Sequence, residues 1–71
     1  MMRDLEYDKR FITEAVKRSG VKEAIYITPN LYDGGYEVRV GSEDFFFEYP
    51  VIDGGDKDHI ENEVKKRYDL Y

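Results

Sequence analysis

The chain has no cysteine, no tryptophan and a single histidine, His59, among its 71 residues. Without cysteine there is no disulfide, no thiolate metal site and no cysteine–histidine catalytic pair. A serine nucleophile would need Ser19 or Ser42 to reach His59, which lies between acidic residues at the start of the expected last helix. We therefore interpret His59 as a surface residue and expect no enzymatic activity.

Long apolar runs are also absent. No stretch approaches the roughly 20 residues that cross a bilayer, and the first residues, MMRDLEYDKR, lack the apolar region of a signal peptide. This pattern favours a cytoplasmic protein without membrane contact. The length predicts one domain over residues 1–71, and with so little surface to bury, its tyrosines and phenylalanines must supply much of the core.

Acidic residues and the histidine surround the Gly54-Gly55 turn, but their spacing does not match a metal-binding loop. The residues are Asp53, Asp56, Asp58 and His59. An EF-hand loop needs oxygen ligands at its first, third and fifth positions, which no starting point here provides. Neither glycine pair has the spacing or the following lysine of a phosphate loop. We read the acids as helix caps and expect no metal and no cofactor.

Residues 4–19 are predicted to form the first helix, because apolar residues recur on one stripe. The stripe contains Leu5, Ile12, Ala15 and Val16, with Phe11 at its margin. The N-cap is either Asp4 or Asp8, and Asp8 would place Tyr7 and Ile12 in hydrophobic-staple positions. Gly20 is the expected left-handed stop.

Three strands are predicted between the helices. The first spans 21–28, with Ile25 and Ile27 on one face, and is expected to end at Pro29 because proline cannot donate to a ladder. The next two form a hairpin at 36–40 and 45–49, joined by a turn over 41–44. In the long connection 29–35, Leu31 and Tyr32 either fold back onto the core, which we favour, or project toward a partner.

A second helix is expected after the break at 53–55, capped by Asp56 or Asp58. Its buried face is predicted to be Ile60, Val64, Tyr68 and Tyr71. Ion pairs four residues apart are expected along both helices: Glu14–Arg18, Glu61–Lys65 and Glu63–Arg67.

The predicted fold is therefore α+β, with the order α-β-β-β-α and a three-stranded antiparallel sheet that carries both helices on one face. Alternation along the strands assigns the inward side chains to Ile25, Ile27, Tyr36, Val38, Val40, Phe45, Phe47 and Tyr49. It leaves Tyr26, Thr28, Glu37, Arg39, Phe46 and Glu48 on the opposite face. In this arrangement the first and third strands are edges.

This element order resembles that of the double-stranded-RNA-binding domain. Such domains read RNA with a Gly-Pro-x-His-type loop after the first strand and a lysine-rich start to the last helix. Here the corresponding segments are Asn30-Leu31-Tyr32-Asp33-Gly34-Gly35 and Asp56-Lys57-Asp58-His59. Both carry the wrong residues, and the second has the wrong charge for a phosphate backbone, so we expect no direct nucleic-acid binding.

The net charge is −5, and the segment from position 43 to 63 contains many acidic residues but only one lysine, Lys57, and no arginine. The candidate partner-binding residues are Glu43, Asp44, Phe46, Glu48, Asp53, Asp56 and Asp58. Carboxylates placed among aromatic rings are suited to a basic groove that normally holds nucleic acid. The alternative interpretation is a solvated face that serves solubility.

In size, acidity and lack of a catalytic set, the chain resembles small phage-encoded inhibitors, including anti-CRISPR proteins and other DNA mimics. The resemblance implies a non-enzymatic inhibitor, acting in the cytoplasm of a host cell, that binds a basic surface of a nucleic-acid-processing protein. The alternative is a small structural or assembly module that self-associates through an edge strand or the open sheet face. The expected state is a monomer or a homodimer.

Overall fold

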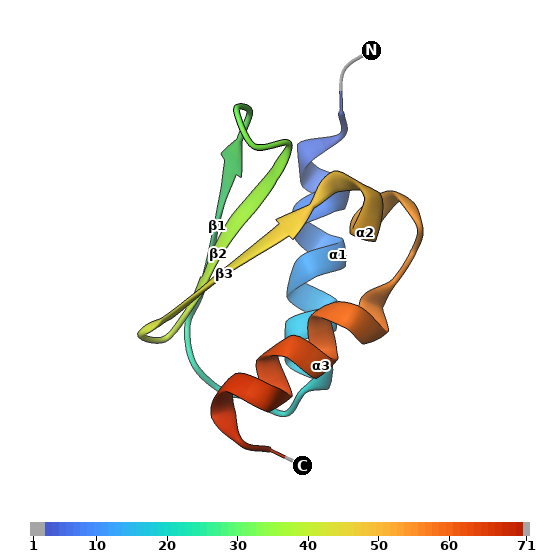
Figure 1. Cartoon of the computed structure of the whole chain (residues 1–71). Helices are drawn as coiled ribbons and strands as arrows, with labels where there is room; N and C mark the ends of the chain where they lie inside the picture. The colour runs from blue at the N-terminus through green and yellow to red at the C-terminus, as the bar shows by residue number, and fades with distance from the viewer. Residues whose placement is uncertain (1–2, 71) are drawn as a thin grey trace.

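The computed structural model describes residues 3–70 as one α+β unit. Its elements are α1 (Leu5–Arg18), β1 (Ile25–Asn30), β2 (Gly35–Val40), β3 (Glu43–Glu48), α2 (Tyr49–Asp53) and α3 (Lys57–Tyr68). The strands form an antiparallel sheet in the order β1-β2-β3, and the helices lie on one side of it (Figure 1). The predicted fold class is confirmed, with the short helix α2 as an addition.

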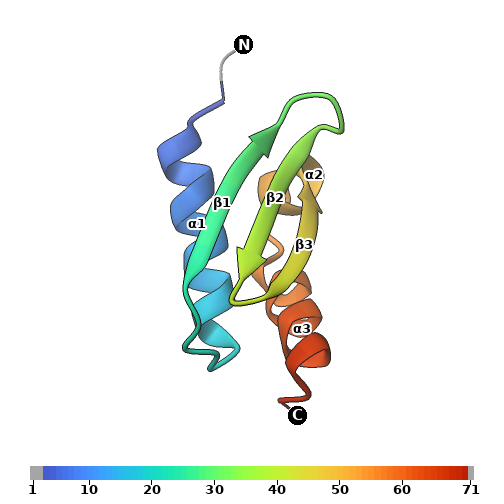
Figure 2. The same cartoon turned by 90° about the vertical axis from the view of Figure 1, so that its left-hand side faces the viewer.

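The two faces of the sheet separate as the alternation predicts. Tyr36, Val38, Val40, Phe45 and Phe47 are buried beneath the helices, while Ile25 and Ile27 at the β1 edge are half-buried. The opposite face, turned toward the viewer in Figure 2, carries no helix. We call it the open face, and its side chains are those of Tyr26, Thr28, Glu37, Arg39, Asp44, Phe46 and Glu48.

The first strand begins later than predicted and does not end at Pro29. It starts at Ile25 and continues to Asn30, with Pro29 opposite Tyr36. Gly41 N donates to Ala24 O at 2.9 Å, and because bonded pairs recur at every second residue of an antiparallel ladder, the nitrogen of Pro29 points to the free edge. Proline is tolerated there because no donor is required.

The hairpin turn is also tighter than predicted. Only Gly41 and Ser42 connect the strands, since Glu43 already pairs with Val40 and Asp44 with Arg39. Gly41 has φ +63°, which suits a two-residue hairpin turn. Glu43 and Asp44 are therefore strand residues, and the change fixes on which side of the sheet each of them lies.

Tyr49 does not extend the third strand, as the alternation predicts, but begins α2. Pro50 follows in the first turn of this helix, where its missing N–H has no cost. The Tyr49 ring is half-buried, packs edge-on against Tyr36 with centroids 5.6 Å apart, and lies under the guanidinium of Arg3 at 3.9 Å. The short helix thereby brings Ile52 into the core.

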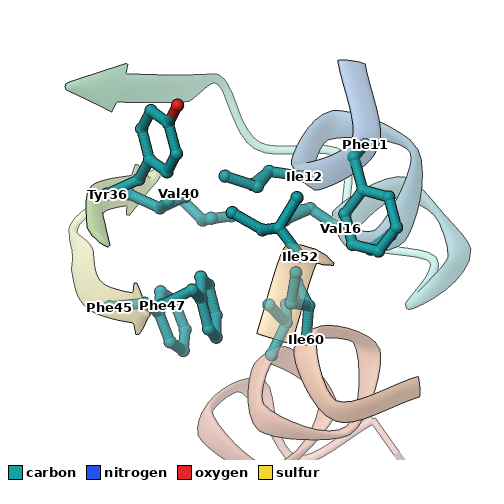
Figure 3. Packing of buried hydrophobic residues seen from close by; sticks show 12 residues of the cluster. Phe11, Ile12, Val16, Tyr36, Val40, Phe45, Phe47, Ile52 and Ile60 are labelled. Carbon is teal, nitrogen blue, oxygen red and sulfur yellow. The ribbon is translucent and has the colours of Figure 1, made fainter. Parts of the chain in front are cut away.

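The core lies between the sheet and the helices, and Figure 3 shows its side chains converging from all of them. Its hydrophobic members are Phe11, Ile12, Ala15, Val16, Tyr36, Val38, Val40, Phe45, Phe47, Ile52, Ile60 and Val64. One prediction for α1 is wrong, because Leu5 of the expected buried stripe is 44% exposed, whereas Phe11, expected at its margin, is buried at 6% exposure. The buried stripe is turned toward the flank of α1 that α3 covers, where Lys57 Nζ lies 5.3 Å from the Phe11 ring.

Helix ends follow the predicted chemistry. Asp4 is the N-cap of α1 and accepts from Tyr7 N at 3.1 Å, so Asp8 is free for another role, and Tyr7 is exposed. Gly20 follows the C-cap with φ +91°. Asp56 caps α3 by accepting from His59 N at 3.0 Å. Ile60 and Val64 are buried and Tyr68 is half-buried, while Tyr71 lies outside the described residues.

Two of the three predicted ion pairs are replaced by contacts between elements. Glu61–Lys65 is present at 2.9 Å. Glu14 instead accepts from Lys57, and Arg18 binds Asp58 and Glu61, which joins α1 to α3. Arg67 reaches Glu43 rather than Glu63, which lies near Lys66. The prediction failed because side chains long enough for a neighbour on their own helix also reach the next element.

Candidate functional site: the open face and its loop

Three rows of side chains cross the open face from β1 to β3. The strand register aligns Tyr26, Arg39 and Asp44 in one row, Thr28, Glu37 and Phe46 in the next, and Asn30, Gly35 and Glu48 in the third. Tyr26 is 63% exposed and Phe46 39% exposed. Two aromatic rings thus lie among carboxylates on a face of the sheet that no helix covers.

Phe46 lies over Gly35 on the neighbouring strand. A Cβ built on Gly35 would come within 2.7 Å of the Phe46 ring and 2.4 Å of the Phe47 carbonyl oxygen. Only glycine leaves room for this ring and for the backbone beside it. Gly35 therefore provides the space that the Phe46 ring occupies on the open face.

Arg39 is the one base on the open face, and it is paired. Its Nε donates to Asp44 Oδ1 at 3.1 Å, and this hydrogen bond raises the pKa of Arg39. An exposed pair of this kind contributes little to stability, so either partner can exchange it for a contact with another molecule at little cost. Within residues 3–70, Glu37 and Glu48 have no ion-pair partner.

The structure brings together only some of the predicted site residues. Asp44, Phe46 and Glu48 share the open face. Glu43 lies on the other side of β3, where its Oε1 accepts from Arg67 Nη1 at 3.2 Å. Asp53, Asp56 and Asp58 lie at the end of α2 and the start of α3, on the helical side.

Each of these three acids has an intramolecular contact. Asp53 accepts two bonds from Arg3, at 2.9 and 3.1 Å, and these hydrogen bonds lower the pKa of Asp53. Asp56 caps α3, and Asp58 accepts from Arg18 at 2.8 Å. The acidic run in the sequence is thus divided between two sides of the molecule.

The loop between β1 and β2 carries two residues, Leu31 and Tyr32, that differ from the favoured prediction. Leu31 is 82% exposed and Tyr32 is 102% exposed, so neither folds back onto the core. The strands end at Asn30 and Gly35, and the four residues between them are too few to return a side chain to the interior. Proline is tolerated in an edge strand, so the sequence is also compatible with a strand that continues past Pro29. That alternative predicts the shorter loop.

Asn30 holds this loop in one shape. Its Oδ1 accepts from the backbone nitrogens of Tyr32 and Asp33, each at 3.1 Å. Its Nδ2 donates to Asp33 Oδ2 at 3.0 Å and to Glu37 Oε2 at 3.1 Å. Through Glu37 the loop is connected to the open face.

The open face is hollowed next to its centre. Tyr26, Thr28, Glu37, Arg39 and Asp44 line a shallow depression of about 620 Å³. In residues 3–70 no group of three histidine or acidic side chains is arranged to hold a metal ion. His59 lies on the helical side, 6.1 Å from the ring of Phe47. The depression offers carboxylates, a guanidinium and aromatic rings, which suit binding to a protein surface.

No helix in the described part of the chain is long and apolar enough to cross a membrane. No protein-family model, no curated protein and no solved structure matches the chain.

Proposed function

We propose that the protein is a non-enzymatic binding protein that uses the open face and the adjoining loop to occupy a basic surface of another protein. The observation that carries this proposal is the exposure of Tyr26 and Phe46 among Glu37, Asp44 and Glu48 on a sheet face without a covering helix. Buried aromatic anchors provide much of the binding energy in protein interfaces. The surrounding carboxylates select a basic partner and accelerate its approach.

The loop supports the same proposal. Leu31 and Tyr32 are apolar side chains held in water by a backbone that Asn30 fixes. A rigid anchor loses little conformational entropy when it enters a pocket of a partner. Asp33 and Glu37 flank the anchor, so the rim of that pocket should also be basic.

The narrower proposal is an inhibitor of the anti-CRISPR type, which blocks a nucleic-acid-binding surface of its target. Carboxylates on the open face would take the place of nucleic-acid phosphates. The aromatic rings would fill apolar sites between the lysine and arginine side chains of the target surface. The support is the acidic character of the open face together with the resemblance in size and charge. Glu43, Asp53, Asp56 and Asp58 belong to a second candidate patch on the helical side.

The test is capture of the partner from a lysate of the source organism, followed by binding with purified partner. We expect the Glu37→Lys/Glu48→Lys double variant to bind at least tenfold more weakly, because both carboxylates face the basic surface. Glu63→Lys on α3 is the control with the same type of charge change. A DNA duplex and heparin should each displace the protein from its partner.

Unchanged binding in the double variant and in Phe46→Ala would contradict the open-face proposal. The site would instead lie on the helical side if binding is lost only when the charges of the second patch are reversed, at Glu43, Asp53, Asp56 and Asp58. Displacement by neither polyanion would rule out the narrower inhibitor proposal.

Self-association through the same face is the competing proposal, favoured by the exposure of Tyr26 and Phe46. Salt distinguishes the two. Two acidic faces repel each other, so raising salt should strengthen a homodimer, whereas it should weaken a complex with a basic partner. Sedimentation of the protein alone at 50 mM and 500 mM salt shows directly whether salt strengthens a homodimer.

A further inference from the structure

The free edge of β1 is the least protected part of the sheet. The ladder alternation turns the main-chain groups of Ile25, Ile27 and Pro29 outward, so the edge offers the N–H groups of both isoleucines and the carbonyls of all three. Edge strands in natural proteins are normally covered, charged or broken. Here Pro29 blocks one end, while the stretch around Ile25 and Ile27 carries no charged side chain.

The opposite edge of the sheet, formed by β3, is better protected. Arg67 Nη1 donates to the Asp44 carbonyl oxygen at 3.2 Å, and its guanidinium lies 4.7 Å from the Phe45 ring. At its far end, β3 passes directly into α2 with Pro50 in the first turn. A long side chain thus protects β3 at one end, and the turn into α2 protects it at the other.

A hollow adjoins the free edge of β1. It measures about 380 Å³ and is lined by Lys9 and Thr13 of α1 and by residues 25–28 of β1. Ile25 and Ile27 are half-buried, so the core is incompletely closed on this side. Figure 2 shows α1 running beside β1, with its N-terminal half outside the strand. The helix therefore forms a floor under the position that a further strand would take.

We propose that the free edge of β1 binds an extended segment of a partner protein, which adds a fourth, antiparallel strand to the sheet. The segment would pair its backbone with Ile25 and Ile27 and direct apolar side chains toward Thr13 and the half-buried isoleucines. Its composition is further specified by Lys9, which forms no ion pair with any residue of 3–70. An acidic side chain on the segment supplies the complementary charge.

A second copy of this chain fits the edge less well than a peptide. Antiparallel pairing of two β1 strands in one continuous sheet would place both α1 helices in the same layer, each reaching past its own strand. The two helices would then compete for one space. A single extended segment has no helix to accommodate, and it is also independent of the open face, so it does not rest on the proposed function.

The test is selection of binders from a phage-displayed library of random twelve-residue peptides with the full-length protein. We expect enriched peptides to alternate apolar residues and to include an acidic one. Binding should weaken at least tenfold in Lys9→Glu and remain within twofold in Arg10→Glu, which makes the same charge change on α1 outside the hollow. In the complex, the amides of Ile25 and Ile27 should exchange with solvent at least tenfold more slowly.

A chemically synthesised chain with N-methyl-isoleucine at position 27 removes only the outward N–H and keeps the side chain. We expect it to keep the far-ultraviolet circular dichroism of the parent and to lose peptide binding. The proposal is overturned if no peptide is enriched, or if the enriched peptides bind the N-methylated chain equally well. It is also overturned if the Ile27 amide is protected in a homodimer without peptide, because the occupant is then a second copy.

Discussion

The carboxylate of Asp8 accepts a hydrogen bond from the hydroxyl of Tyr36 inside the core, joining the first helix to the central strand. Asp8 is 4% exposed and Tyr36 is 0% exposed. Arg3 Nε also donates to the Asp8 carboxylate at 3.0 Å, and the same guanidinium binds Asp53 at the end of α2. A buried carboxylate is costly unless it is paired, and here one hydroxyl and one guanidinium provide the pairing.

Removing the Tyr36 hydroxyl should measure how much its hydrogen bond to Asp8 contributes to stability. Tyr36→Phe leaves the ring in place and takes one donor away from a buried carboxylate, so we expect a loss of about 1–3 kcal/mol in the free energy of unfolding. Urea unfolding gives the value. Tyr7→Phe, at an exposed tyrosine on α1, is the matched control and should change stability by less than about 0.5 kcal/mol. Equal effects in the two variants would show that the buried hydrogen bond contributes nothing.

The same contact predicts sensitivity to alkali. Burial, and then the hydrogen bond to Asp8, raise the pKa of Tyr36 to about 12 from the ordinary value of 10.0. Between these values the folded state binds more protons than the unfolded state, so stability falls as pH rises through this range. Urea unfolding from pH 9 to pH 12 should show a steeper decline in the parent than in Tyr36→Phe. Parallel profiles would mean that Tyr36 ionises alike in both states.

Acid should weaken the contact between Arg3 and Asp53. The two hydrogen bonds from Arg3 lower the pKa of Asp53. A lowered folded-state pKa means that the contribution is present above the ordinary value of 3.8 and is lost as pH falls through the folded value. We expect Asp53→Asn to be less stable than the parent at pH 7 and to approach it as the pH falls below 3.8 and through the lowered pKa of Asp53. A constant difference between the two across this range would contradict the assignment.

Gly35 should not accept a side chain. Its added Cβ would meet the Phe47 carbonyl oxygen at 2.4 Å, a main-chain atom that cannot rotate away. Gly35→Ala should therefore destabilise the protein by about 1–3 kcal/mol, as overpacking does elsewhere. Thermal unfolding of Gly35→Ala and of Gly35→Ala/Phe46→Ala separates the two contacts. Full recovery in the double variant would assign the whole effect to the ring, and we expect partial recovery only.

Local patterns predicted most of the architecture. The period of two in Tyr36, Val38 and Val40 identifies the inward face of β2, because a strand directs alternate side chains to opposite sides. The predictions for Pro29 and Tyr49 are wrong for a common reason. Whether proline interrupts a ladder depends on which side of the strand has a neighbour, and whether a chain turns into a helix depends on the space beside it. Both are decided by distant parts of the chain.

The candidate site was predicted in part for a similar reason. Asp44, Phe46 and Glu48 share a face because they alternate within one strand, which the sequence displays directly. Asp53 and Asp58 are close to them in sequence, but helices carry them to the other side, where Arg3 and Arg18 bind them. A run of like charges along a chain does not specify a patch in space.

The position of Pro29 gives a last prediction about the β1 edge. Its nitrogen points outward, whereas the neighbouring Thr28 is aligned with Glu37 and directs its N–H into the ladder. Thr28→Pro should therefore remove an internal hydrogen bond and leave its acceptor unpaired, at a cost of about 1–3 kcal/mol in stability. Pro29→Thr should stay within about 1 kcal/mol of the parent, since it disturbs no internal pair. Similar losses of stability in the two variants would mean that both nitrogens face the same side, and the assignment of the free edge would then be wrong.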